Sequence, residues 1–74
     1  MKIAPEQNSA QAIQVLTDEL KNPDVLCRIL AAEALARIGP AAHSATSALT
    51  AAAKDADPDV KTAAVEALKR IAPK

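Results

Sequence analysis

The chain's only cysteine and only histidine, Cys27 and His43, are the residues whose chemistry could support nucleophilic or acid–base catalysis. A cysteine attacks as the thiolate, which needs an exposed and electropositive setting. Arg28 follows Cys27, but successive residues on a helix do not face each other. A histidine needs a partner beside it to act as acid or base, and the sequence identifies none for His43. We therefore predict that neither residue is catalytic and that the chain is not an enzyme.

No cofactor or metal site is predicted either. A zinc site needs three or four converging ligands, and one cysteine, one histidine and scattered carboxylates show no such spacing. A phosphate-binding loop needs several glycines, whereas Gly39 is the chain's only one.

Four charged residues form a recurring surface pattern: Glu33, Arg37, Glu66 and Arg70. Each glutamate precedes its arginine by four residues, the favourable order on a helix, which is worth about 0.2–0.5 kcal/mol per ion pair. We predict a row of such pairs on an exposed side of the protein. This row is either a face that binds a partner or a solvated face that keeps the protein soluble.

The charges recur because the chain repeats itself at an offset of 33 residues. Glu33-Ala34-Leu35 returns as Glu66-Ala67-Leu68, and Arg37-Ile38 returns as Arg70-Ile71. A fixed period of this length indicates stacked structural repeats.

Prolines near the starts of four helical stretches predict helices over about 8–21, 23–38, 41–54 and 58–71. Asn22 and Asp57 precede prolines and are the predicted N-caps, and Gly39 fits a left-handed position after the second helix. Short connections make successive helices antiparallel, so an all-α fold of two helical hairpins side by side is expected.

The apolar residues of the last helix lie on one stripe, and those of the second helix repeat it. The two stripes are Val60, Ala63, Ala64, Ala67, Leu68 and Ile71, and Cys27, Leu30, Ala31, Ala34, Leu35 and Ile38. Cys27 takes the place of Val60, so it is expected in the core.

The copies differ at the connection before each of these helices. The linker at Asn22 is expected to be two residues shorter than the one from Asp55 to Asp59. Val25, Leu26 and Ile29 then count as extra apolar residues. They either cover the hairpin corner or pack against the first helix, or they form a self-association surface.

The segment 45–71 resembles a HEAT-like repeat, in particular the short form named after phycobilisome lyases, through Leu49, Lys54, the turn Asp57-Pro58-Asp59-Val60, Lys61 and the end Ala67-Leu68-x-x-Ile71. Residues 10–39 match the same pattern. The resemblance implies an α-α superhelix (solenoid) of two HEAT-like hairpins with four antiparallel helices in one domain, 1–74. Repeat one spans about 8–39 and repeat two about 40–73.

The resemblance also implies two roles for charged residues. The side that carries Glu33, Arg37, Glu66 and Arg70 lines the concave surface in such stacks. Arg28 and Lys61 are expected to pair with an aspartate near a turn, with Asp24, Asp57 or Asp59 as candidates. Lyase activity is not expected, because a two-repeat piece lacks the necessary cavity.

Size and composition restrict the partners. Nine basic residues balance nine acidic ones, and there is no aromatic residue, so neither nucleic acid nor an anionic membrane is an expected partner. No run of about 18 apolar residues, no signal peptide and no possible disulfide are found, so a cytoplasmic location is expected.

These observations favour a non-catalytic protein–protein interaction or scaffold module whose protein partner is not identified. The alternative is a structural one: a fragment or cap of a larger HEAT solenoid, or a chain that self-associates as a twofold dimer to bury an open repeat end. A lyase-related enzyme subunit is the third and weakest hypothesis. The partners expected are thus a protein, further copies of the chain, or the neighbouring repeats of a longer array.

Overall fold

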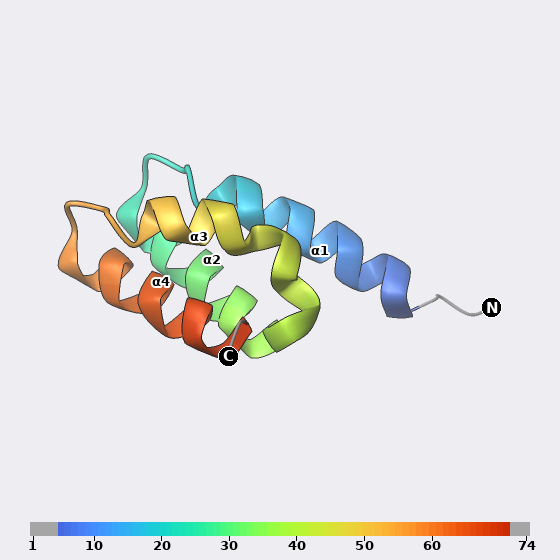
Figure 1. Cartoon of the computed structure of the whole chain (residues 1–74). Helices are drawn as coiled ribbons and strands as arrows, with labels where there is room; N and C mark the ends of the chain where they lie inside the picture. The colour runs from blue at the N-terminus through green and yellow to red at the C-terminus, as the bar shows by residue number, and fades with distance from the viewer. Residues whose placement is uncertain (1–4, 72–74) are drawn as a thin grey trace.

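In the computed structural model, the backbone is described for residues 5–71 and the side chains for residues 10–71. Four α-helices and one 3-10 helix follow one another along the chain: α1 (Pro5–Glu19), α2 (Val25–Ile38), η1 (Gly39–Ala45), α3 (Thr46–Ala52) and α4 (Pro58–Ile71). There is no strand in this part of the chain. Helices α1 and α2 form one hairpin, η1–α3 and α4 form the next, and α4 lies against α2 (Figure 1). The fold is therefore all-α, as the sequence predicts.

The boundaries of α4 match the sequence prediction at both ends, whereas the predicted helix 41–54 is not continuous. Its first part is the 3-10 helix η1, which has a kink in its middle, at Ala42 (φ −88°, ψ 22°). Pro40 lies in the first turn of η1, where its missing N–H costs no hydrogen bond. Only the seven residues of α3 are α-helical.

The two linkers that precede α2 and α4 are the same length, which corrects the expected difference of two residues. Both helices have 14 residues, and their first residues, Val25 and Pro58, lie 33 positions apart. Asp24 is the N-cap of α2, since its Oδ1 accepts from the Leu26 N–H at 2.9 Å. Asn22, the cap predicted from the sequence, lies one step earlier and accepts from the Asp24 N–H at 2.8 Å.

The second linker repeats this arrangement. Asp55 Oδ1 accepts from the Asp57 N–H at 2.8 Å, and Asp57 Oδ1 accepts from the N–H groups of Asp59 and Val60 at 2.9 and 3.2 Å. Asp57 thus caps α4, as predicted. The period of 33 residues extends through the linkers, so every position of α2 has an equivalent on α4.

The core of the described residues is made largely of alanine. Seven of its thirteen buried residues are alanines, and the full set is Ile13, Leu20, Ala31, Ala32, Leu35, Ala42, Ala45, Leu49, Ala52, Val60, Ala64, Ala67 and Ile71. The predicted stripe of α4 is confirmed, because four of its members are fully or almost fully buried and the other two pack against the core. Small side chains let helix axes approach closely, which suits a chain without aromatic residues.

The stripe predicted for α2 is wrong on one flank. Leu30 is 54% exposed, and Cys27 and Ala34 are only partly buried, whereas Ala32 is fully buried. The reason is that α2 has its most extensive contact with α4 on the flank of Ala32. The opposite flank is open at Leu30, and Cys27 is only partly buried, so Cys27 is not a core residue equivalent to Val60.

Gly39 ends α2 with a backbone conformation that other residues rarely adopt. Its φ of 77° confirms the predicted positive value, but its ψ of −147° places it outside the left-handed helical region, in a region that is essentially restricted to glycine. Its N–H donates to the Leu35 carbonyl and closes the helix. No atom lies within 4 Å of the position that a Cβ would occupy, so only the backbone conformation demands glycine here.

We expect Gly39→Ala to lower the free energy of unfolding by about 1–3 kcal/mol, because an L residue is strained at this φ and ψ. Thermal unfolding should show this as a drop in Tm of roughly 4–8 °C per kcal/mol. The matched control is D-alanine at position 39, introduced by chemical synthesis, for which the same angles mirror the favourable polyproline II region. The D-alanine chain should be at least as stable as the wild type, and equal destabilisation by both alanines would contradict the account.

Candidate functional site

A groove lies between α2 and α4 on the surface of the protein, with a volume of about 730 Å³. Its lining comprises Ile29, Glu33, Ala36 and Arg37 from α2 and Asp59, Thr62, Ala63, Glu66 and Arg70 from α4. The four charged residues predicted as a partner-binding face therefore all line one groove. Asp59 and Thr62 also line it and were not singled out from the sequence.

The charged side chains of the groove are exposed, and they do not pair with each other. Among the described residues the only ion pair is Arg28–Asp55, so neither Glu33–Arg37 nor Glu66–Arg70 is within ion-pair distance. The expected row of helix ion pairs is thus absent. The gain from such a pair is only about 0.2–0.5 kcal/mol, and the entropy lost when two long exposed side chains are fixed offsets it.

The charges of the groove are sorted along its length. Helices α2 and α4 both start at linkers that Arg28 joins, so they run in the same direction (Figure 1). Asp59, Glu33 and Glu66 come earlier along their helices, and Arg37 and Arg70 come later. The partly buried apolar residues run alongside these charges: Ile29 and Ala63 come before Glu33 and Glu66, and Ala36 comes between Glu33 and Arg37. The groove therefore has an acidic half, a basic half and an apolar strip.

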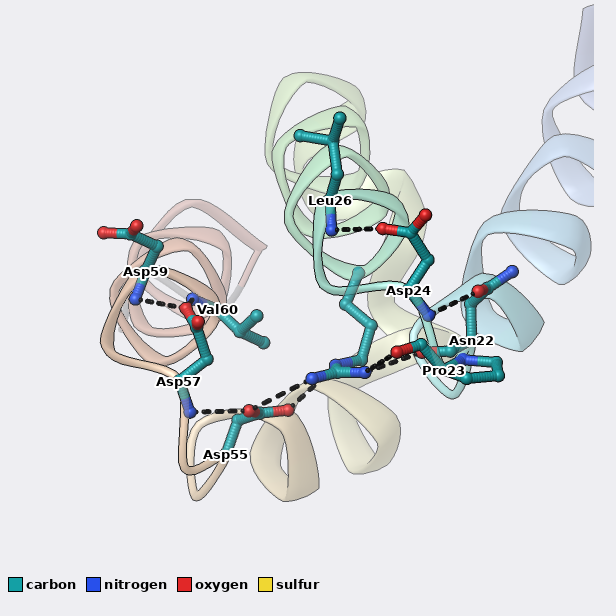
Figure 2. A network of polar contacts seen from close by, with 9 residues as sticks. Asn22, Pro23, Asp24, Leu26, Asp55, Asp57, Asp59 and Val60 are labelled. Atoms are coloured by element: carbon teal, nitrogen blue, oxygen red, sulfur yellow. Dashed lines mark hydrogen bonds and ion pairs between the residues drawn. The ribbon is translucent and has the colours of Figure 1, made fainter.

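A second polar feature, the linker network, lies where α2 and α4 begin (Figure 2). One terminal nitrogen of Arg28 donates to the backbone carbonyls of Asn22 and Pro23 at 2.7 and 3.1 Å. The other terminal nitrogen donates to Asp55 Oδ1 at 3.5 Å, and Nε lies 3.0 Å from Asp55 Oδ2. The Nε–H is not aligned for a hydrogen bond, so that contact is an ion pair alone.

The linker network corrects the predicted partner of Arg28, which is Asp55 and not Asp24, Asp57 or Asp59. Asp55 was missed because the linkers were taken to differ in length. Aligning Asn22 with Asp55 at the 33-residue offset would have found it. The side chains of Arg28 and Asp55 are only 18% and 17% exposed, so this pair is better shielded from solvent than an ordinary surface ion pair.

A family model described as HEAT repeats matches residues 1–73, almost the whole chain. The chain belongs to the HEAT-repeat family. Neither the curated proteins nor the solved structures contain a significant match to it. The family match does not specify the phycobilisome-lyase type of repeat, which stays a prediction.

In the second HEAT repeat, the linker holds Asp55 in its charged form. The pKa of the Asp55 carboxyl lies below the ordinary value of 3.8, first because the Asp57 N–H donates to it. Removal from water acts in the opposite direction, and the hydrogen bond and positive charge of Arg28 lower the pKa further. Lys61, the counterpart of Arg28 in this repeat, is exposed and has no ion pair with another described residue.

The structure places the remaining candidates as follows. Val25 and Leu26 are exposed, at 36% and 59%, whereas Ile29 packs against the core beside the groove, so a self-association surface made of these three residues stays a prediction. Cys27 is partly buried, and His43 is exposed within η1.

The described part of this HEAT-repeat chain has neither a metal site nor a membrane-spanning helix. No three His, Cys, Asp or Glu side chains there lie close enough together to hold a metal ion. No helix there is long and apolar enough to cross a membrane.

We expect the contribution of Asp55 to stability to depend on pH. Because its folded pKa is lowered, that contribution is fully present above the unfolded value of 3.8 and is lost as the pH falls through the lower folded pKa. Asp55→Asn keeps the acceptor for the Asp57 N–H but removes the charge. The wild type should therefore have the higher Tm at neutral pH, and the difference should close at strongly acidic pH.

The matched control is Asp59→Asn, which removes an exposed aspartate that accepts no hydrogen bond from another described residue. NMR titration of Asp55 in Arg28→Gln should show a pKa that rises toward 3.8 but stays below it, since the Asp57 N–H remains. A constant Tm difference between wild type and Asp55→Asn at every pH would contradict this account.

Proposed function

We propose that this chain is a non-catalytic interaction module that binds a segment of another protein in the groove between α2 and α4. HEAT repeats generally mediate protein–protein interaction or scaffolding. The observation that carries the proposal is the set of exposed charges without ion-pair partners around a partly buried apolar strip. Charged groups already paired within the chain would have to be separated before they could bind a ligand, whereas these are free to do so.

The sorting of charges defines the chemistry of the segment. A short peptide with basic residues at one end, acidic residues at the other and small or aliphatic side chains interspersed among them would match the groove. Its basic end would lie near Asp59, Glu33 and Glu66, and its acidic end near Arg37 and Arg70. Arginine can hold a carboxylate with two parallel hydrogen bonds, so the basic half is the stronger determinant of orientation.

The alternative is that these charges only keep the surface soluble. Separated charges of both signs on an exposed face serve that purpose without any ligand. This alternative predicts no preference for the order of charges in a bound peptide, and the two hypotheses are therefore separable by experiment.

We expect selection from a displayed peptide library to yield sequences with basic residues at one end and acidic residues at the other. The double variant Arg37→Glu/Arg70→Glu should bind the selected peptides at least about tenfold more weakly, which corresponds to about 1.4 kcal/mol. Fluorescence anisotropy at low and high salt measures the affinities. Affinity should also fall with salt, because the groove is exposed.

The matched control is Lys69→Glu, which reverses an exposed charge next to Arg70 that does not line the groove. This variant should bind the peptides almost as the wild type does. Equal affinities for the wild type and the double variant, with both chains folded by circular dichroism, would exclude the groove as the binding site.

A further inference from the structure

The contact between α2 and α4 uses one flank of each helix. The flank of α2 that faces away from α4 and the flank of α4 that faces away from α2 are left open. On α2 the residues toward α4 are Ile29, Ala32 and Ala36, of which two line the groove and one is fully buried between them. Their equivalents on α4, 33 positions later, are Thr62, Val65 and Lys69, all of which are exposed. Thr62 also lines the groove, whereas Val65 and Lys69, with the partly buried Leu68, form the open flank of α4 that is named the C-flank.

The converse holds on α2. The residues of α4 toward α2 include Val60, Ala63 and Ala67, which are buried or packed against the core. Their equivalents on α2 are Cys27, Leu30 and Ala34, of which Leu30 is 54% exposed and the other two are partly exposed. This open flank of α2 is named the N-flank. The N-flank is thus equivalent to the surface of α4 that packs on α2, and the C-flank is equivalent to the surface of α2 that packs on α4. One lies at each end of the pair of hairpins.

The two ends of the protein also carry the equivalents of the two residues that pair in the linker network, Arg28 and Asp55. Lys61 is the equivalent of Arg28 and lies at the C-flank end without an ion pair among the described residues. Asn22 is the equivalent of Asp55 and lies at the N-flank end. Its Oδ1 accepts from the Asp24 N–H as Asp55 accepts from Asp57, and its Nδ2 donates to the Glu19 carboxylate at 2.9 Å. Glu19 therefore supplies the negative charge that Asn22 lacks.

We propose that copies of this chain stack head to tail, with the N-flank of one copy against the C-flank of the next. Lys61 of one copy then reaches the Asn22–Glu19 corner of its neighbour, as Arg28 reaches Asp55 within the chain. The occupant is a second copy because the two flanks are repeat equivalents of surfaces that already pack together. The inference is independent of the proposed groove function.

The stacked contact differs from the internal one in size and strength. Leu30 replaces Ala63 and Val65 replaces Ala32, so the two helices must lie farther apart than α2 and α4 do. Lysine also lacks the planar, two-pronged geometry of arginine. The association is therefore reversible and depends on concentration. A contact between two different flanks leaves one flank free at each end, so it adds further copies, unlike the twofold dimer expected from the sequence.

Two charge variants test the arrangement by analytical ultracentrifugation. Leu30→Lys blocks the N-flank, and Val65→Lys blocks the C-flank, where Lys61 and Lys69 already lie. The weight-average mass of the wild type should rise above that of a dimer of the 7.6 kDa chain as its concentration increases. Each variant alone should remain monomeric at the same concentrations. An equimolar mixture of the two should form a one-to-one dimer and stop there, because it holds one intact pair of flanks.

Restored assembly in the mixture also shows that both variants fold. A third variant, Glu19→Gln, should weaken the wild-type association severalfold at low salt, because it removes the negative charge opposite Lys61 and keeps the oxygen that accepts from Asn22 Nδ2. A wild type that stays monomeric at millimolar concentration would overturn the proposal. Dimers formed by either blocked variant alone would also overturn it, since they would form through a contact other than that between the N-flank and the C-flank.

Discussion

The packing of α2 against α4 is the interaction on which the rest of this structure depends. The chain has no aromatic residue, and its described core consists mainly of alanine, so its stability cannot come from a few large side chains. It must come from close approach of helix backbones over a long shared surface, where many small dispersion contacts add up. The contact between α2 and α4 is the most extensive in the protein, and fully buried alanines lie on both helices.

The other features of the molecule follow from this contact. Helices that pack along their length in the same direction bring their preceding linkers together, where Arg28 joins them through Asp55 and two backbone carbonyls (Figure 2). On the outer side of the same contact lies the groove, in which equivalent charges of the two repeats face the same space. The flanks that the contact does not use become the two ends of the stack. In the described part of the chain, the groove and two unequal ends thus result from a single packing arrangement.

The sequence predicts the all-α fold, the buried stripe and both ends of α4, and the four charged residues of the groove. It does so because α4 has neighbours on one side only, so the period of its apolar residues coincides with its burial. The same reasoning fails for α2, where Leu30 is exposed and Ala32 is buried. The apolar period of one helix cannot tell which flank a neighbouring repeat covers. The side chain of Ala32 is a single methyl group, so the sequence does not distinguish this buried alanine from an exposed one.

The linkers show a second limit of sequence reasoning. Each contains two residues that can cap a backbone N–H, Asn22 and Asp24 in one and Asp55 and Asp57 in the other. The prolines occupy different places relative to them, and aligning the prolines shifts the register by two residues. The hydrogen bonds show that the capping residues, and not the prolines, keep the 33-residue period. With the register restored, Arg28 and Asp55 become a pair that the sequence alone did not identify.

The most direct test of the central claim is the stability of Ala32→Leu measured against Ala51→Leu, which adds the same atoms at an exposed position of α3. If α2 and α4 are in close contact at Ala32, the larger side chain must force them apart. Ala32→Leu should then lower the free energy of unfolding by about 1–3 kcal/mol. Ala51→Leu should change it by no more than about 0.5 kcal/mol. An Ala32→Leu protein as stable as the wild type would show that the helices are not packed as described.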